Sequence, residues 1–213
     1  MKFAYAVIVS AVLASTLQAD ILYTDGTPDY LHGDELGFRI EADSFSFSAA
    51  STITHVMFQG LSLNPPANYT GSVYWFIYSN ASGIPGTTLA SGFATPPAVD
   101  IHDFATYSAF QFDFDIAAFP VTAGTTYWLG LHNGPTSPFL PGSQAVSWAA
   151  ATGGIDPLPS QSYDLSSASP VWGQAANPDH YFQLSGISGV PEPSTWLMVS
   201  VGLALATFLK RKK

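Results

Sequence analysis

Apolar and polar residues alternate with a period of two in several short segments of the chain, a pattern typical of β-strands with one buried face. The clearest example is residues 110–116, where phenylalanine alternates with polar residues. Successive side chains of a strand point to opposite faces, so Phe112 and Phe114 share one face while Asp113 and Asp115 share the other. We predict that the two phenylalanines face the core and that the two aspartates face solvent.

Other short segments carry strand signals through alternation or through β-branched and aromatic residues. They are residues 44–48, 52–58, 72–78, 89–94, 99–104, 125–131, 145–149 and 180–184. Clusters of proline, glycine and asparagine separate them. Residues 160–169 are rich in serine and are expected to form a loop, and no segment before residue 190 keeps a helical period. We therefore predict an all-β domain of about eight or nine strands, an antiparallel β-sandwich of the jelly-roll type.

The first 19 residues have the order of a secretory signal peptide. Lys2 precedes an apolar run over residues 3–14, and a stretch of small and polar residues leads to Ala19. This basic, hydrophobic and then small-residue order is typical of secretion signals, and the apolar run is short for a membrane span. We place signal cleavage after Ala19, with Ala14 as the alternative. Residues 1–19 are then the signal peptide and residues 20–189 the β domain.

The C-terminal residues 190–213 have the order of a membrane anchor. Pro191 and Pro193 disfavour helix, and the uncharged residues 194–209 that follow are near the lower length limit for a membrane-spanning helix. A basic cluster that would keep the far end in the cytoplasm comes last, and it consists of Lys210, Arg211, Lys212 and Lys213. We predict a single transmembrane helix whose N-terminal side lies outside the cytoplasm.

The residues Val190, Pro191, Glu192 and Pro193, followed by an apolar helix and a terminal basic cluster, resemble the PEP-CTERM sorting signal. The resemblance covers residues 190–213, and it departs from the family in one respect, because the basic cluster is rich in lysine where the family commonly has arginine. It implies that exosortase, a membrane-bound processing enzyme of Gram-negative bacteria, is a partner. It also implies export, anchoring in the inner membrane before processing, and a destination in the cell envelope or the extracellular matrix. Glu192 would be a recognition residue.

The body of the chain resembles a β-sandwich domain that often precedes such tails. The resemblance rests on residues 73–78 and 83–86, on residues 122–129, and on residues 179–186. These motifs consist of turns and core aromatic residues, so the resemblance implies a fold and no reaction.

Charge is distributed unevenly along the chain. All of its 15 acidic residues except Glu192 lie between residues 20 and 189, whereas Arg39 alone of the 6 lysines and arginines lies there. A domain this acidic would repel a phosphate backbone, so we expect no nucleic acid among its partners. The chain has no cysteine, which excludes disulfides, thiolate metal sites and thiol nucleophiles.

The sequence contains no metalloprotease, phosphate-binding or serine-hydrolase motif. Asp113 and Asp115 share a strand face and would serve glycoside hydrolysis if a partner lay at the right distance, but a solvated strand face is the simpler interpretation. The five histidines lack metal-ligand spacing, and we interpret them as solvated or structural. They are His32, His55, His102, His132 and His180. We assign no catalytic residue.

Calcium is the cation that the acidic residues would suit, because it prefers oxygen ligands. The candidate donors are Asp20, Asp25, Asp29, Asp34, Glu35, Asp100, Asp103, Asp156, Asp164 and Asp179. No contiguous calcium loop connects them, so no ligand set is assigned and the expected cofactor is none, with Ca²⁺ as the alternative.

Aromatic side chains offer flat faces for stacking on sugars, although most rings in a small sandwich belong to the core. The candidates are Tyr74, Trp75, Trp128, Trp148 and Trp172. Trp75 directly follows Tyr74, and Trp128 directly follows Tyr127, so we predict that one ring of each pair faces inward and the other outward.

These observations favour an exported, non-catalytic protein of the cell surface or extracellular matrix. A carbohydrate-binding module that acts on exopolysaccharide is the alternative, and an enzyme such as a glycosidase or esterase is a third hypothesis. A glycan-binding measurement separates the first two.

Overall fold

The computed structural model describes residues 19–63, 69–104, 107–136, 146–155 and 157–189. Within these ranges the chain forms thirteen β-strands and no helix, which confirms the prediction of an all-β domain. The strands are β1 (Asp20–Thr24), β2 (Thr27–Glu35), β3 (Arg39–Ser46), β4 (Ser51–Ser62), β5 (Val73–Asn80), β6 (Pro85–Ala94), β7 (Val99–Asp103), β8 (Ser108–Val121), β9 (Thr126–Asn133), β10 (Ser147–Thr152), β11 (Gln161–Asp164), β12 (Trp172–Gln174) and β13 (Phe182–Ser188).

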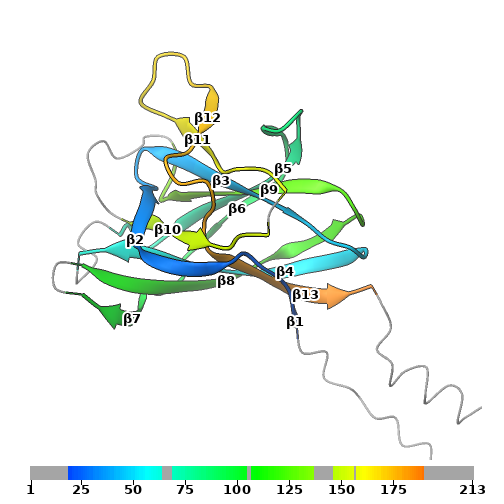
Figure 1. Ribbon diagram of the computed structural model, residues 1–213, viewed down its shortest axis with the longest axis horizontal. Coiled ribbons are helices and arrows are strands. Elements are labelled where there is room, and N and C mark those ends of the chain that lie inside the picture. Colours follow the sequence, from blue (N-terminus) through cyan, green and yellow to red (C-terminus); the bar gives the residue numbers. More distant parts are fainter. Residues whose placement is uncertain (1–18, 64–68, 105–106, 137–145, 156, 190–213) are drawn as a thin grey trace, which may run out of the picture.

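The strands build two antiparallel sheets (Figure 1). The 7-stranded sheet has the order β1-β13-β4-β10-β2, and in addition β8 pairs with β4 and β7 pairs with β8. The 6-stranded sheet has the order β12-β11-β3-β9-β5-β6. Both sheets contribute side chains to one hydrophobic core, so the two sheets pack face to face.

Aromatic rings dominate the core between the sheets. Phe45 and Trp75 come from the 6-stranded sheet, and Phe58, Phe112 and Trp148 come from the 7-stranded sheet. The rings of Phe58 and Phe112 stack with their centroids 4.7 Å apart. Removing a side chain of this size from water contributes about 1.5–3 kcal/mol to folding, so these rings account for much of the stability of a domain that has no cysteine.

The predicted facing of strand β8 is confirmed. Phe112 and Phe114 are buried in the core. On the opposite face, 41% of the Asp113 side chain and 92% of the Asp115 side chain are exposed. The alternation of apolar and polar residues along β8 therefore predicted correctly that the two phenylalanines are buried and that the two aspartates face solvent.

The predicted number of strands was too low. Each predicted segment overlaps an observed strand, but β1, β2, β11 and β12 were not expected. Three of them lie at sheet edges, where one side is open to solvent and polar residues are tolerated, so the alternation that marks a strand is weak. The loop expected at residues 160–169 is wrong in its first part, because Gln161–Asp164 forms β11 and pairs with β3.

The two ends of the domain lie next to each other. Asp20, the first residue of β1, pairs with Gly186 of β13, and β13 ends at Ser188 (Figure 1). Ala19, after which we place signal cleavage, is exposed. Most of the predicted signal peptide, the motif at residues 190–193, the expected membrane helix and the basic cluster lie outside the described residues. In the part of the chain that is described, no helix is long and apolar enough to cross a membrane.

Candidate functional site

The two aspartates considered for glycoside hydrolysis bind a histidine on the outer face of the 7-stranded sheet. His55 of β4 lies opposite Asp115 of β8. Its Nδ1 atom is 2.9 Å from Asp115 Oδ1, and its Nε2 atom is 3.4 Å from Asp113 Oδ1. The two carboxylates thus contact different ring nitrogens on an exposed surface, which is typical of a cross-strand ion pair. His55 was expected to be solvated or structural, and its pairing with the two aspartates could not be predicted because it depends on cross-strand register.

The acids considered as calcium donors do not gather at one place. Asp29 and Asp164 each accept a hydrogen bond from the backbone amide two residues later in the chain, and Asp25 accepts one from the amide of Ile155. Asp156 lies outside the described residues. Among the described side chains, Asp34 alone of the ten acids considered belongs to a group of three metal-ligating residues.

That group lies in a buried carboxylate cluster, which we define as Asp34, Glu41, Asp43 and His180. Asp34 is 4% exposed, and the other three are fully buried. One ligand atom from each of Asp34, Glu41 and His180 lies within 4.8 Å of the others. The cluster brings together strands from both sheets, because Asp34 belongs to β2 whereas Glu41 and Asp43 belong to β3.

Strand periodicity explains why these acids are buried. Glu41, Asp43 and Phe45 alternate along β3, and Phe45 faces the core, so the two carboxylates point between the sheets. Asp34 pairs directly with Trp148 of β10, another core residue, and paired residues share a face. The predicted strand began at residue 44, whereas β3 begins at Arg39, so the two acids were not assigned to it. Their alternation with Phe45 was the available signal.

Hydrogen bonds fix the orientation of His180. Its Nε2 atom is 3.1 Å from Asp34 Oδ2, and its Nδ1 atom is 2.8 Å from Ser160 Oγ. The backbone amide of His180 donates to Asp43 Oδ2 at 2.6 Å. The imidazole also stacks on Trp148, with ring centroids 4.7 Å apart. This histidine, expected to be structural or solvated, is therefore held in one position among carboxylates.

The acids of the cluster differ in their electrostatic environment. Burial raises the pKa of Asp34, but hydrogen bonds from His180 and Asn177 outweigh it, so the pKa lies below its ordinary value of 3.8. Burial raises the pKa of Glu41 to about 8, and the charge of Asp34 adds to this effect, while a hydrogen bond from Ser162 opposes it. The cluster thus combines an ionised carboxylate with a carboxyl group that holds its proton at neutral pH.

An aromatic strip runs over the outer face of the 6-stranded sheet. In spatial order it consists of Phe93, Tyr74, Phe76, Tyr78, Trp172 and Tyr163. Neighbouring rings have centroid distances between 4.9 Å and 6.3 Å. A Cβ atom at Gly130 would lie 2.7 Å from the ring of Tyr78, so this glycine lets the ring lie across β9. Phe93 is 55% exposed, and most other rings of the strip are partly exposed.

The two rings of each Trp–Tyr pair lie on opposite faces of the sheet, as predicted, but Trp128 is fully buried and offers no face to a sugar. Trp75 lies in the core, and its neighbour Tyr74 belongs to the outer aromatic strip. Tyr127 lies in the core, whereas Trp128 belongs to a separate cluster with Tyr78. Of the other sugar-stacking candidates, Trp148 is a core residue and Trp172 is partly exposed on the strip.

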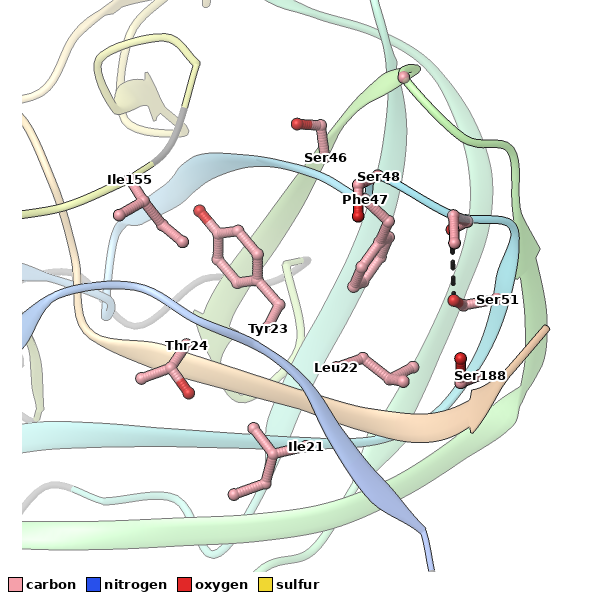
Figure 2. Close-up of a pocket in the computed structure, with 12 residues that line it drawn as sticks. Ile21, Leu22, Tyr23, Thr24, Ser46, Phe47, Ser48, Ser51, Ile155 and Ser188 are labelled. Carbon is pink, nitrogen blue, oxygen red and sulfur yellow. Dashed lines mark hydrogen bonds between the residues drawn. The ribbon is translucent and has the colours of Figure 1, made fainter. Parts of the chain in front are cut away.

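A groove of about 740 Å³ opens at the end of the domain where the chain enters and leaves (Figure 2). Figure 2 shows Leu22, Tyr23 and Phe47 as side chains that line this space, with Ser51 and Ser188 at one end. Ser51 donates a hydrogen bond to the carbonyl oxygen of Ala49 at 3.3 Å. The lining residues that the structure describes offer apolar carbon and hydroxyl groups, and none of them is charged.

Comparison of the chain with protein-family models, with curated proteins and with solved structures finds no match. Function is therefore inferred from the chain's own residues. The buried carboxylate cluster, the aromatic strip and the C-terminal residues carry that inference.

Proposed function

We propose that the chain is an exported, non-catalytic protein of the cell envelope or extracellular matrix, sorted by exosortase through residues 190–213. The observation that carries the proposal is the order of three elements at the C-terminus: Val190-Pro191-Glu192-Pro193, an uncharged stretch and a basic cluster. The order of the first residues supports export, with cleavage after Ala19. In this proposal the protein is anchored in the inner membrane until exosortase processes it.

The arrangement of the β domain supports this role. β13, the last strand that the structure describes, ends at Ser188, so the described core lies upstream of the motif that begins at Val190. β1 begins beside β13, so both processing segments attach at the same end of the domain. Processing at either segment would leave the two sheets intact. We also propose that the sandwich is of the jelly-roll type.

The test is the substitution Glu192→Ala in the native host. We expect the unprocessed precursor to accumulate, because the substitution removes the acidic residue of the proposed recognition motif, where prolines on both sides favour an extended backbone. An immunoblot of cell fractions measures the precursor. The thermal midpoint of the domain should not change, because the core lies upstream of residue 190.

Asp115→Ala is the matched control, because it removes an acid whose side chain is 92% exposed on the domain surface. This variant should mature at the wild-type rate. If Glu192→Ala also matures at the wild-type rate, Glu192 is not a recognition residue and the tail is a simple membrane anchor.

Carbohydrate binding is a second candidate function, and the aromatic strip is the observation that favours it. Sugars stack on partly exposed rings, and an exposed apolar patch on a soluble domain often marks a binding surface. The surrounding domain is acidic, which disfavours acidic polysaccharides and favours neutral ones. The exopolysaccharide partner is therefore proposed to be a neutral glycan that lies along the strip.

Glycan-array binding of the wild type and of a Tyr74→Ala variant tests this function. We expect the variant to lose binding, because Tyr74 contacts both Phe76 and Phe93 within the strip. Leu31→Ala is the control, because Leu31 is 71% exposed and lies on the other sheet. Equal glycan binding by all three proteins, or none by the wild type, would remove carbohydrate binding from consideration.

A further inference from the structure

We propose that Asp34, Glu41 and His180 bind one divalent transition-metal ion of the zinc class between the two sheets. Their ligand atoms converge within 4.8 Å of one another, which lets one ion reach all three after small side-chain movements. Imidazole and carboxylate are the ligand types that zinc takes together. This site is independent of the sorting signal and of the aromatic strip.

The first argument is the balance of charge in the buried carboxylate cluster. Asp34, Glu41 and Asp43 are all buried, and an unpaired buried carboxylate is costly. Arg39 is the only lysine or arginine in residues 20–189, and it begins the same strand as Glu41. The ring nitrogens of His180 lie 3.1 Å from Asp34 and 3.8 Å from Asp43, which leaves Glu41 as the acid of the cluster without an ion pair among the described residues. A divalent ion would supply positive charge where the three side chains meet.

The second argument is the unused oxygen of Glu41. Glu41 is fully buried, and its Oε1 atom accepts a hydrogen bond from Ser162 Oγ at 2.8 Å. Its Oε2 atom has no hydrogen-bond partner among the described residues. Buried polar atoms are nearly always satisfied, so this lone pair indicates a ligand that the protein atoms do not provide.

The third argument is the outer shell of hydrogen bonds. His180 uses Nε2 toward Asp34 and holds Nδ1 against Ser160 Oγ, which is the arrangement that fixes a ligating imidazole. The backbone and side-chain nitrogens of Asn177 both donate to Asp34 Oδ2, at 2.9 Å and 3.1 Å. Each proposed ligand is thus held by a neighbour, so the ligand directions are set before an ion arrives.

The imidazole also determines the class of ion. Calcium and magnesium prefer cages of oxygen ligands, and calcium takes six to eight of them, whereas the carboxylates of Asp34 and Glu41 offer at most four. His180 is fully buried between two carboxylates, and a neutral imidazole nitrogen suits zinc and its neighbours in the transition series. When the ion binds Nε2 of His180, the ring proton is carried by Nδ1, which donates to Ser160 Oγ, and any proton on Glu41 leaves to solvent.

The surface group of His55, Asp113 and Asp115 provides a matched comparison. It has similar ligand types, but its two aspartates contact different ring nitrogens, so a single ion cannot replace both contacts. It is also exposed, so its carboxylates are solvated. The double variant Asp113→Asn/Asp115→Asn therefore removes two acids without touching the proposed site.

The experiment measures metal content in the full-length protein produced in zinc-supplemented cells. The buried ion should exchange slowly, so the purified protein is passed through EDTA before analysis by mass spectrometry. We expect about one zinc per chain in the wild type and in the surface double variant. Glu41→Gln and His180→Gln should retain less than about a tenth of that amount. Parallel cultures with added calcium should yield no bound calcium.

Ser160→Ala tests the positioning role of Ser160 in a variant that keeps all three ligands. Its zinc affinity, measured by competition with a chelator, should fall about 10- to 100-fold while the circular dichroism spectrum stays that of the wild type. If the purified wild-type protein contains no zinc, the proposal is wrong, and the cluster holds a proton on Glu41 in place of an ion. Zinc lost in the surface double variant but kept in Glu41→Gln, or calcium bound in place of zinc, overturns it as well.

Discussion

Phe112 shows how one residue of the alternating pattern contributes to stability. Its ring is fully buried and stacks on Phe58, so Phe112→Ala should lower the free energy of unfolding by about 3–5 kcal/mol through lost burial and the cavity that remains. Phe93→Ala is the control, because Phe93 is 55% exposed and its loss should cost about 0.5 kcal/mol or less. Urea unfolding measures both variants. Equal losses would contradict the assignment of Phe112 to the core.

His132 makes the stability of the domain depend on pH. It is fully buried, and burial lowers its pKa below the ordinary value of 6.5 because the charged imidazolium would lose its hydration. As the pH falls below 6.5, His132 binds a proton in the unfolded chain before it does so in the folded chain. Stability therefore falls as the pH drops below this value, by at most about 1.4 kcal/mol per pH unit.

The variant His132→Gln should remove this part of the pH dependence. Urea unfolding in EDTA, from about pH 7.5 down to about pH 5, compares the variant with the wild type. His32→Gln is the control, because the His32 side chain is 65% exposed. If the wild type and His132→Gln lose stability in parallel on acidification, the buried imidazole is not the source.

For single residues, the sequence predicted which face of a strand a side chain occupies, but it did not predict which residues contact each other across strands. The alternation of residues 110–116 was sufficient to place Phe112 and Asp113 on opposite faces. It could not show that Asp34 and His180, far apart in sequence, share a hydrogen bond. Such a contact depends on the register of several strands, which local pattern does not encode.

Close packing between strands β13 and β4 limits which side chains β13 accepts. A Cβ atom at Gly186 would lie 2.0 Å from the carbonyl oxygen of Thr52, at the irregularity where the register of the two strands shifts. Gly186→Ala should therefore push the strands apart and lower the free energy of unfolding by about 1–3 kcal/mol.

Gly173→Ala on β12 is the matched control, because a Cβ atom there meets nothing within 4 Å. Its stability should change by less than about 0.5 kcal/mol. Thermal or urea unfolding of both variants gives the comparison. A Gly186→Ala protein as stable as Gly173→Ala would mean that β13 adjusts freely beside β4.

Element prediction succeeded where burial was greatest. β8 and β9 carry apolar runs or alternation because they face the core, and both were predicted. β2 was missed because its sequence, TPDYLHGDE, has polar residues throughout and lies at a sheet edge. β12 has only three residues, too few for a period to be visible.

At the scale of the whole molecule, the proposed sorting role depends on the basic cluster at the C-terminus. Deleting Lys210, Arg211, Lys212 and Lys213 should move protein out of the membrane fraction or block its processing. Each basic residue near an anionic leaflet contributes about 1 kcal/mol to holding that end in place. Fractionation of native-host cells followed by immunoblotting measures the effect.

A chain with arginine at all four of these positions is the control, because it keeps the charge and should be sorted like the wild type. If the deletion variant fractionates like the wild type, the basic cluster is not required for sorting. The order of signal, domain and tail stays a prediction, made because each segment has its own composition. The arrangement of the sheets could not be predicted, since it depends on pairing between strands that are distant in sequence.

The position of β13 has a mechanical consequence. β13 is hydrogen-bonded on both sides, to β1 and to β4, and it is the last strand before the tail. A pull on Ser188 along the strand would load both ladders in shear, so that many hydrogen bonds must break together. A pull between Asp20 and Ser188 would instead peel β1 from β13 one bond at a time. A domain held by its C-terminal end therefore resists drag far better than one stretched between its two ends.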